Sequence, residues 1–205
     1  MTAYTAWIKE SAGFIRGLDC NHLITVGIEG ATPWPNYVNT DLRRDHADVD
    51  YATIHVWPQN WGWFSPKATP GSRNDLDHAW LESAKYIDAA IAEATALGKP
   101  LVVEEFGLAR DGEQHRPGGA TGQRDSFYLK LCRHLANKPE IVAGLNFWAW
   151  SGEGRPRGVD EQVVWARGDP LMGDPPHELQ GWYGVYDTDE STHAVMSQCA
   201  QLLRS

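Results

Sequence analysis

The chain has 205 residues, a formal net charge of −9 at pH 7 and a pI of about 5.3. This length suits a single domain with a sizeable core, over residues 1–205. The negative charge argues against nucleic acid or an anionic membrane surface as a partner. Residues 1–11 carry charges and no apolar run, and no stretch is long enough to span a bilayer. We therefore expect neither a signal peptide nor a transmembrane segment.

The first half of the chain alternates helical and strand patterns. Apolar residues at spacings of three and four predict helices, and short apolar runs bounded by turn residues predict buried strands. A loop rich in Pro, Asn and Asp separates the first two strands. The expected order is a helix over 5–18, a strand over 23–28, a loop over 31–49 with a short helix near 38–43, and a strand over 51–57 ended by Pro58.

The second half continues the same alternation and ends in a long loop. The clearest helix is expected over 77–97, because its apolar positions repeat at three and four and Gly98 can end it. A loop of about 40 residues without structure of its own is usually functional. The expected order is the helix 77–97, a strand over 100–106, a loop over 107–120, a helix over 125–136, a strand over 141–148, the long loop 149–190 and a helix over 191–203.

Two residue types stand out in the composition. The ten tryptophans exceed ordinary usage, and they indicate a large core or a surface that stacks on flat apolar faces such as those of sugar rings. The three cysteines, Cys20, Cys132 and Cys199, lack metal-binding spacing and lie in or beside expected helices. We interpret them as small buried residues rather than as a disulfide framework, with one bridge left open as the alternative.

Polar and aromatic residues stand at the carboxyl end of every expected strand. They are Glu29, His55 with Trp57, Glu105, and Trp148. Strands that alternate with helices form parallel sheets, and ligand sites in such sheets lie outside the carboxyl ends of the strands. One such residue would be weak support, since an isolated Glu there is more often a loop ion pair or a helix cap. The whole set indicates the mouth of a barrel.

Longer motifs make the sequence recognisable. It resembles the carboxyl-terminal half of a glycoside hydrolase family 5 enzyme, most closely the endo-β-1,4-mannanase branch, over nearly all of residues 1–205. This resemblance implies an α/β fold of the (β/α)8 TIM-barrel type, with strands five to eight present. The motifs that carry it are Ile-His-Val-Trp-Pro-Gln-Asn-Trp-Gly-Trp at 54–63, Lys-Pro-Leu-Val-Val-Glu-Glu-Phe-Gly at 99–107, Asn-Phe-Trp-Ala-Trp at 146–150, Gly-Asp-Pro-Pro at 173–176, and the run 180–187.

The resemblance assigns catalytic roles to two residues. Glu105, directly before the Phe-Gly pair, matches the family nucleophile, and His55 matches a histidine that orients the site; on its own, His55 would be read as a satisfied core histidine. Successive side chains of a strand point to opposite faces, so we expect Glu104 to point away and to serve as a structural ion-pair partner. Glu29 matches a carboxylate near the leaving-group side, and an ion pair with a loop arginine is an equal alternative.

The aromatic residues receive substrate-binding roles in the same way. Trp148 matches the tryptophan under the sugar that is cleaved. Trp57 stands where the family usually has a tyrosine that holds the nucleophile, and an indole N–H can donate a hydrogen bond but cannot accept one. Trp61, Trp63 and Trp165 are further candidates for sugar stacking, with packing inside the loops as the alternative.

One departure from the family pattern concerns the second carboxyl group. Retaining glycosidases use two carboxyl groups about 5 Å apart, and the family acid/base Glu follows an Asn at the end of strand four. The chain contains no Asn-Glu pair, and a whole barrel needs about 250 residues. We therefore expect strands one to four and the acid/base to be absent from it.

The expected parent activity is retaining hydrolysis of internal β-1,4-mannosidic bonds in mannan, glucomannan or galactomannan, with this chain inactive alone. A β-1,4-glucanase parent and a non-catalytic carbohydrate-binding fragment are the alternatives. The expected partners are a β-mannan polysaccharide or oligosaccharide and the missing amino-terminal half-barrel, with no nucleic acid, membrane, metal or cofactor. By resemblance, an intact parent would be secreted or periplasmic.

Overall fold

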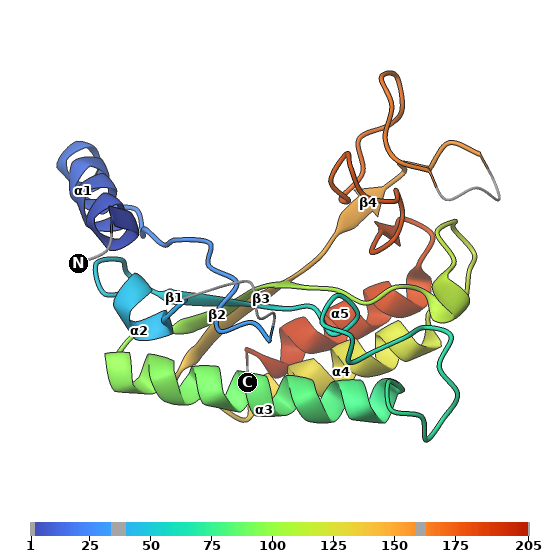
Figure 1. Ribbon diagram of the computed structural model, residues 1–205, viewed down its shortest axis with the longest axis horizontal. Helices are drawn as coiled ribbons and strands as arrows, with labels where there is room; N and C mark the ends of the chain where they lie inside the picture. Colours follow the sequence, from blue (N-terminus) through green and yellow to red (C-terminus); the bar gives the residue numbers. More distant parts are fainter. Residues whose placement is uncertain (1–2, 34–39, 159–162, 205) are drawn as a thin grey trace. The chain divides into compact units, whose positions relative to one another are not determined.

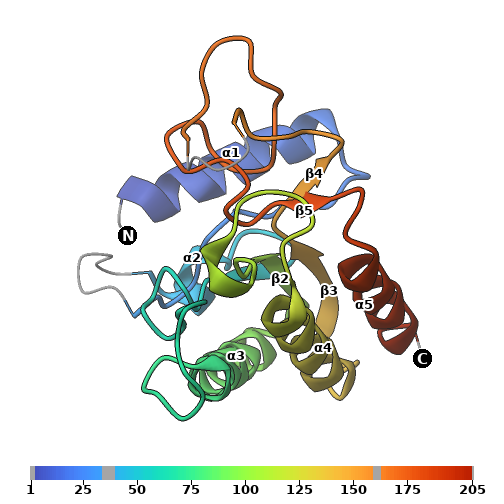
Figure 2. The same cartoon turned by 90° about the vertical axis from the view of Figure 1, so that its right-hand side faces the viewer.

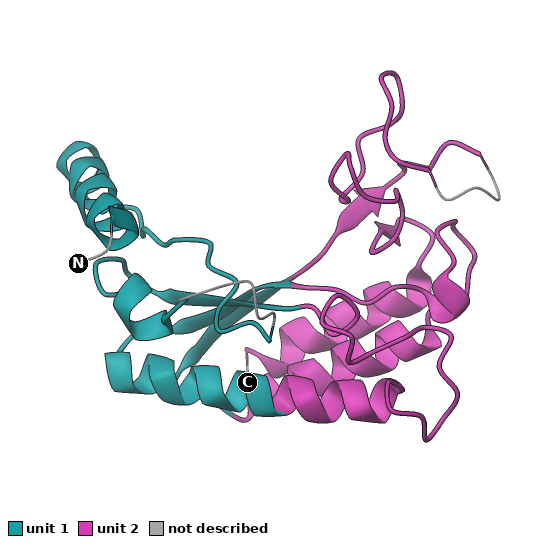
Figure 3. Ribbon diagram, viewed as in Figure 1, with its two compact units in different colours: residues 1–56, 85–105, 138–146 teal, residues 57–84, 106–137, 147–205 magenta. Residues whose placement is uncertain are grey.

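A computed structural model describes residues 3–33, 40–158 and 163–204. The chain forms two compact units (Figure 3). Unit 1 holds residues 1–56, 85–105 and 138–146, and unit 2 holds residues 57–84, 106–137 and 147–205. The elements in chain order (Figure 1) are α1 (Ala3–Leu18), α2 (Leu42–Asp45), β1 (Ala52–Val56), α3 (Leu76–Leu97), β2 (Leu101–Phe106), the 3-10 turn η1 (Asp111–Glu113), α4 (Gly122–Ala136), β3 (Val142–Phe147), β4 (Trp150–Gly152), β5 (Val185–Tyr186) and α5 (Glu190–Leu202).

The sheet of unit 1 has the strand order β1-β2-β3. The Ala52 N–H donates to the Pro100 carbonyl and the Leu101 N–H donates to the Ile141 carbonyl, both at 2.8 Å. Each bond joins the starts of two neighbouring strands, so the strands run in the same direction. The expected parallel sheet and three of its four expected strands are confirmed.

The expected strand over 23–28 is wrong, because this segment lies beside β1 without forming a backbone ladder. The Ile28 N–H donates to the Val26 carbonyl of its own segment at 2.9 Å. The hydroxyl of Thr53 contacts the carbonyls of Val26 and Ile28 at 2.8 and 3.2 Å, where backbone groups would otherwise pair. A side chain therefore takes over part of the pairing that an apolar run alone predicts for the backbone.

The loop before β1 contains one short helix, α2, and part of the expected helix 38–43 lies outside the described residues. Asp41 caps α2 by accepting the Arg44 N–H at 2.9 Å. The Lys99 ammonium donates to the carbonyls of three residues of the turn after α2, at 2.5 to 2.7 Å. These residues are His46, Ala47 and Val49. A residue just before β2 thus fixes the approach to β1.

Helix α1 buries only a narrow stripe. Ile8 and Ala12 pack with Val49 in the core of unit 1. On the same helix Trp7 and Phe14 are 58% and 69% exposed, and the terminal Leu18 is 76% exposed. Single exposed apolar residues are ordinary, but several on one helix indicate a surface that another segment or molecule covers.

Unit 2 is built on the parallel pair α4 and α5, which lie side by side in both views (Figure 2), with Thr192 at the start of α5 hydrogen-bonded to Asp125 at the start of α4. A disulfide between Cys132 of α4 and Cys199 of α5 joins them across 67 positions of the sequence. The interpretation of these two cysteines as unpaired is therefore wrong, and the single bridge left open is the correct alternative. Cys20 is free and exposed, so the interpretation of this cysteine as a buried residue is also wrong.

A buried charge cluster holds the start of α5 in unit 2. The Asp189 carboxylate forms an ion pair with Arg110 and lies 3.6 Å from the Arg124 guanidinium, and all three side chains are almost fully buried. Both arginines also donate to the Gly184 carbonyl. Buried charges persist only when they are paired and hydrogen-bonded, so removing one member would leave the others uncompensated.

The described residues of the long loop 149–190 contain regular structure that was not expected. Residues of β4 pair in parallel with β5, and Val164 forms an isolated antiparallel bridge with Leu179. Sequence patterns cannot reveal strands of two or three residues, because one or two alternations of polarity occur by chance.

The disulfide gives a first test of unit 2. Replacing both cysteines (Cys132→Ala with Cys199→Ala) should lower the free energy of unfolding by about 4 kcal/mol, because the unfolded chain loses a cross-link over a loop of this length. Urea unfolding would measure it, and Cys20→Ala is the matched control that should leave the midpoint unchanged. Equal midpoints for the double variant and the parent would contradict a stabilising bridge.

Candidate active site

The carboxylates singled out from the sequence meet at one histidine in unit 1. His55 lies near the end of β1, and Glu104 and Glu105 lie near the end of β2. The Nδ1 atom of His55 is 3.1 Å from a carboxylate oxygen of Glu105, and its Nε2 atom is 3.3 Å from one of Glu104. All three side chains are partly exposed, so the cluster is open to a ligand.

The expectation that Glu104 points away from the site is wrong. Its carboxylate turns into space that Gly27 leaves, since a Cβ atom on Gly27 would stand 3.2 Å from a Glu104 oxygen. From there it reaches the His55 ring on the side opposite Glu105. Glu104 is still an ion-pair partner, as predicted, but one that fixes the imidazole from the second side.

Glu29 is connected to this cluster through its main chain. Its carbonyl accepts the His55 N–H at 2.9 Å and the Tyr86 hydroxyl at 2.6 Å. Burial and the nearby Glu29 charge raise the pKa of Tyr86 well above its ordinary value, so this phenol stays a donor. The segment that carries Glu29 is thereby fixed beside β1, and its expected role near the leaving group stays a prediction.

An aromatic cluster occupies unit 2. The Trp57 ring centroid lies 6.1 Å from that of Trp148 and 5.0 Å from that of Tyr183. The Trp148 N–H donates to the Phe106 carbonyl at 2.7 Å, next to Gly107. A Cβ atom on Gly107 would stand 2.7 Å from the Trp57 ring and 3.0 Å from the Trp148 carbonyl oxygen. The glycine that follows Phe106 is therefore required by this close approach.

Sequence reasoning missed Tyr183 and the residues that hold it. Its buried hydroxyl donates to the Asn60 side-chain oxygen, and burial raises its pKa. The Asp174 carboxylate accepts the Gly181 and Tyr183 N–H groups at 2.7 and 3.1 Å. The only sequence signal was that 173–176 and 180–187 match the resembling family, which by itself gave these residues no role.

The remaining tryptophan candidates are divided. Trp61 is buried and its ring contacts that of Trp63 at a centroid distance of 4.9 Å. The Trp165 indole donates to the Asp169 carbonyl of its own loop at 3.2 Å. That bond favours the packing alternative for Trp165, whereas Trp61 and Trp63 line a pocket of unit 2.

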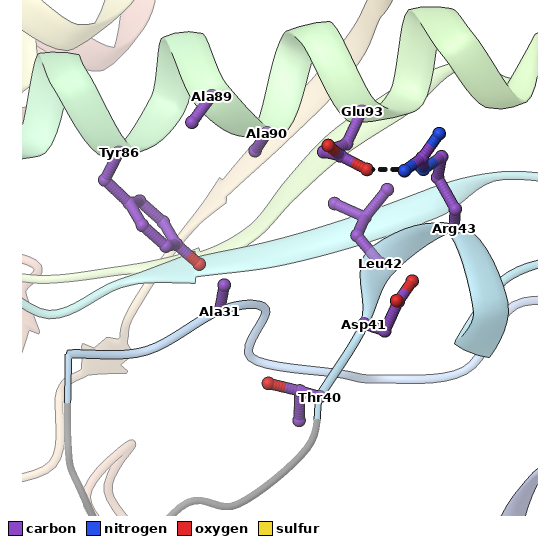
Figure 4. A pocket seen from close by; sticks show the side chains of 9 residues that line it. All are labelled: Ala31, Thr40, Asp41, Leu42, Arg43, Tyr86, Ala89, Ala90 and Glu93. Atoms are coloured by element: carbon purple, nitrogen blue, oxygen red, sulfur yellow. Dashed lines mark ion pairs between the residues drawn. The ribbon is translucent and has the colours of Figure 1, made fainter.

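A separate pocket of unit 1 contains none of the expected site residues (Figure 4). Its volume is about 390 Å³, and the Arg43–Glu93 ion pair at 2.6 Å lies along it. Its lining residues are Ala31, Thr40, Asp41, Leu42, Arg43, Tyr86, Ala89, Ala90 and Glu93. Within the described ranges no group of three or more His, Cys, Asp or Glu residues could hold a metal ion, and no helix is long and apolar enough to cross a membrane.

A parallel sheet with carboxylates and a histidine at its carboxyl end is the arrangement of barrel hydrolases, and comparison with known proteins agrees. The model of glycoside hydrolase family 5, β-mannosidase-like, matches residues 1–205. The chain belongs to glycoside hydrolase family 5. Its fold is that of part of the (β/α)8-barrel enzymes of this family.

Individual relatives carry related names. The chain is 35% identical over 160 residues to mannan endo-1,4-beta-mannosidase 4 of Oryza sativa subsp. japonica, covering 70% of this chain and 32% of the relative. It is 25% identical over 167 residues to mannan endo-1,4-beta-mannosidase 4 of Solanum lycopersicum, covering 72% of this chain and 37% of the relative. The chain therefore spans about a third of the length of these relatives.

Solved structures give the same assignment. A glycoside hydrolase family 5 mannosidase from Rhizomucor miehei superposes with a TM-score of 0.82 at 32% identity, covering 98% of this chain and 48% of that protein. A variant of that enzyme was solved in complex with mannosyl-fructose. The endo-β-1,4-mannanase from Thermotoga petrophila superposes with a TM-score of 0.62 at 22% identity, covering 98% of this chain and 40% of that protein. At this level of identity the match supports the fold alone.

The Asp174 carboxyl gives a pH-dependent test of the loop that carries Tyr183. Burial raises its pKa from 3.8 to about 6, so between these values the folded chain binds more protons than the unfolded chain. The contribution of Asp174 is therefore greatest below about pH 4 and is lost as the pH rises through 6, a change of about 3 kcal/mol for a shift of this size.

Asp174→Asn should remove this dependence, because the amide has no charge to desolvate. The variant keeps one acceptor oxygen, so the loop retains one of its two N–H bonds. Urea unfolding at pH 4.5 and pH 7 would give the change in the free energy of unfolding with pH for the variant and for the parent. This change should be smaller in the variant. Parallel pH profiles would contradict the raised pKa.

Proposed function

We propose that the chain is the carboxyl-terminal half of a retaining β-mannan hydrolase, with segment 23–28 in the place of strand five and β1 to β3 as strands six to eight, and that residues 1–205 are a single partial catalytic domain. The observation that carries the proposal is the position of Glu105. It stands directly before Phe106 and Gly107 on β2, with its carboxylate 3.1 Å from the His55 ring. Family membership supports the class of reaction, and the names of the relatives support β-1,4-linked mannan as the substrate.

The proposed mechanism has two displacements. The Glu105 carboxylate attacks the anomeric carbon, and the bond to the leaving sugar breaks as a glycosyl-enzyme ester forms. A second carboxyl group protonates the leaving oxygen, then takes a proton from the water that hydrolyses the ester. His55 holds Glu105 in position, and Glu104 fixes the opposite side of the His55 ring, so the nucleophile is oriented before the substrate arrives.

We assign sugar contacts to the tryptophans and to Glu29. Trp148 would stack on the pyranose ring that is cleaved, since aromatic rings pack well against the apolar face of a sugar. Trp57 would donate its indole N–H where the family usually places a tyrosine hydroxyl. Glu29 would contact the leaving-group side, and Trp63, which packs on the buried Trp61, would contact a further sugar residue.

The acid/base and the first four strands are proposed to lie outside these 205 residues. The absence of an Asn-Glu pair in the sequence supports this, as does the coverage of 48% of the Rhizomucor miehei mannosidase. The exposed apolar face of α1, with Trp7, Phe14 and Leu18, supplies a surface for such a partner. A β-1,4-glucanase parent lacks comparable support, because the related sequences named above are mannan-cleaving by name.

The disulfide adds a proposal about location. Disulfides such as Cys132–Cys199 form and persist in oxidising compartments. We therefore propose that the protein works outside the cytoplasm, in secreted or periplasmic form. This would place it where polymeric mannan is available.

The nucleophile can be tested in a barrel restored with an amino-terminal half. Glu105→Ala should lower mannan hydrolysis by several orders of magnitude, because no covalent intermediate can form. Glu104→Ala, one residue away, is the matched comparison: it should lower stability and slow turnover far less than Glu105→Ala, because it frees one side of the His55 ring but leaves the nucleophile in place. Azide should restore cleavage of an activated aryl mannoside by the Glu105 variant and give the α-configured azide. Near-normal turnover by that variant would remove Glu105 from the role.

The chain by itself should be inactive and should not persist as a monomer. Several hundred Å² of exposed apolar surface costs on the order of 10 kcal/mol, as much as the whole stability of a typical domain, about 5–15 kcal/mol. Light scattering should find edge-to-edge dimers or larger species, and a reducing-sugar assay should find no cleavage of mannan.

A stable monomer that hydrolyses mannan would overturn both the half-barrel and the missing acid/base. A stable species that binds mannan without cleaving it would instead favour the second candidate function, a non-catalytic carbohydrate-binding fragment. The absence of the family acid/base from the sequence is the observation in favour of that candidate.

A further inference from the structure

A second histidine of unit 1, His46, is fully buried where α2 ends. Its Nδ1 atom lies 2.8 Å from the Leu42 carbonyl oxygen, and its Nε2 atom accepts the Thr53 N–H at 3.0 Å. A carbonyl can only accept a hydrogen bond and a backbone N–H can only donate one, so Nδ1 carries the proton and Nε2 the lone pair. The two contacts therefore fix one neutral tautomer of the ring.

The ring is connected by hydrogen bonds to the strand that carries His55. Thr53, which His46 holds by its N–H, donates its hydroxyl to the Val26 carbonyl at 2.8 Å. The segment that begins there continues to Glu29, whose carbonyl accepts the His55 N–H at 2.9 Å. His46 thus stands at one end of a path of hydrogen bonds that ends at the main chain of His55.

The main chain of His46 is fixed as well. The Lys99 ammonium donates to its carbonyl at 2.6 Å and to the carbonyls of Ala47 and Val49 at 2.7 and 2.5 Å. Three bonds from one side chain hold the turn that carries the ring. The position of the ring relative to β1 is therefore set from both its backbone and its side chain.

A proton on Nε2 would break the contact with β1. The new N–H of His46 would face the N–H of Thr53, and two donors cannot bond to each other. The Thr53 hydroxyl lies 3.2 Å from the same nitrogen and could accept from it, but the Thr53 N–H would still lose its acceptor. A buried N–H without a partner is destabilising.

The surroundings of the ring favour its neutral form. Burial lowers the pKa of His46, and the Lys99 ammonium lowers it further, whereas the Leu42 hydrogen bond and the Asp45 charge raise it without reversing the net decrease. Asp45 is itself paired with Arg44 at 2.7 Å. The titratable groups of the packed elements are Tyr4 and Arg16 of α1, Arg44 and Asp45 of α2, Asp48 and Asp50 of the next turn, and Lys99.

We propose that His46 is a positioning residue for the His55–Glu105 pair and that it serves this role only as a neutral imidazole. It holds β1 and the segment 23–29 in register, so that the His55 ring meets the Glu105 carboxylate at 3.1 Å. Protonation of His46 releases this register. The role in catalysis rests on the proposed function, whereas the fixed tautomer follows from the hydrogen bonds of the ring.

The first test is nitrogen NMR of the full chain with 15N-labelled histidine. The His46 signals, assigned by their loss in His46→Gln, should show a neutral ring with the proton on Nδ1 at pH 7. They should change to those of the charged ring only below the ordinary histidine pKa of about 6.5. A proton on Nε2, or a charged ring at pH 7, would overturn the proposal.

The second test uses the barrel restored with an amino-terminal half. His46→Leu should lower kcat on mannan about 10-fold with a smaller change in KM, because small misplacements of positioned groups slow the chemical step by this order. His46→Gln should recover most of the rate, since its amide oxygen can accept the Thr53 N–H. Glutamine does not titrate, so the rate of this variant should fall less than that of the parent between pH 6 and pH 4.

The matched control is His22→Gln, at an exposed histidine paired with Asp19, and it should leave the rate and its pH profile unchanged. An unchanged kcat in His46→Leu, or an acid decline in His46→Gln equal to that of the parent, would overturn the positioning role. A loss of folded protein alone would leave the shape of the pH profile as it is. If circular dichroism shows that His46→Leu does not fold, the His46→Gln profile and the ring signals decide.

The outcomes separate this inference from the proposed function. Normal hydrolysis in Glu105→Ala would remove the assigned nucleophile, while the ring signals of His46 would still report the fixed tautomer. Loss of hydrolysis in Glu105→Ala, with the same pH profile in His46→Gln and the parent, would keep the enzyme and remove His46 from its positioning role.

Discussion

The contact of His55 with two successive carboxylates is the constraint on which the proposed chemistry depends. An imidazole has two nitrogens on opposite edges, and here each faces one carboxylate, at 3.1 Å for Glu105 and 3.3 Å for Glu104. The pairing of β1 with β2 brings these residues together, and Gly27 leaves the space that Glu104 occupies. The same strand register that builds the sheet therefore orients the proposed nucleophile.

Unit 2 contains long loops with little regular structure, and buried polar groups hold these loops in place. Asp189 pairs with Arg110 at the start of α5, while Asp174 accepts two N–H groups of the loop that carries Tyr183. Each carboxylate costs free energy to bury and is stabilised only by its own donors. The loops are thus fixed by a few specific hydrogen bonds in addition to their buried side chains, such as Tyr183 and Val185.

The sequence predicted what depends on periodicity and on long motifs. It predicted the helices α1, α3, α4 and α5, the three paired strands, and the proximity of His55 to Glu105. It failed where one side chain decides the outcome. The hydroxyl of Thr53 replaces backbone pairing beside β1, and alternation alone could not show that Glu104 turns toward His55. Spacing could not pair Cys132 with Cys199, because the bridge depends on how α4 and α5 pack.

The two carboxylates that share His55 do not by themselves supply a complete retaining site. The acid/base must deliver a proton to the glycosidic oxygen while the nucleophile approaches the anomeric carbon from the other side. Glu104 lies on the same strand as Glu105, and one of its carboxylate oxygens contacts His55. Its position therefore suits it to orient the His55 ring rather than to deliver a proton. Glu29 belongs to a different segment, whose carbonyl accepts the His55 N–H. If this chain proves active without a partner, Glu29 is therefore the first carboxyl group to test for the acid/base role, because its segment is bonded to His55 through the main chain.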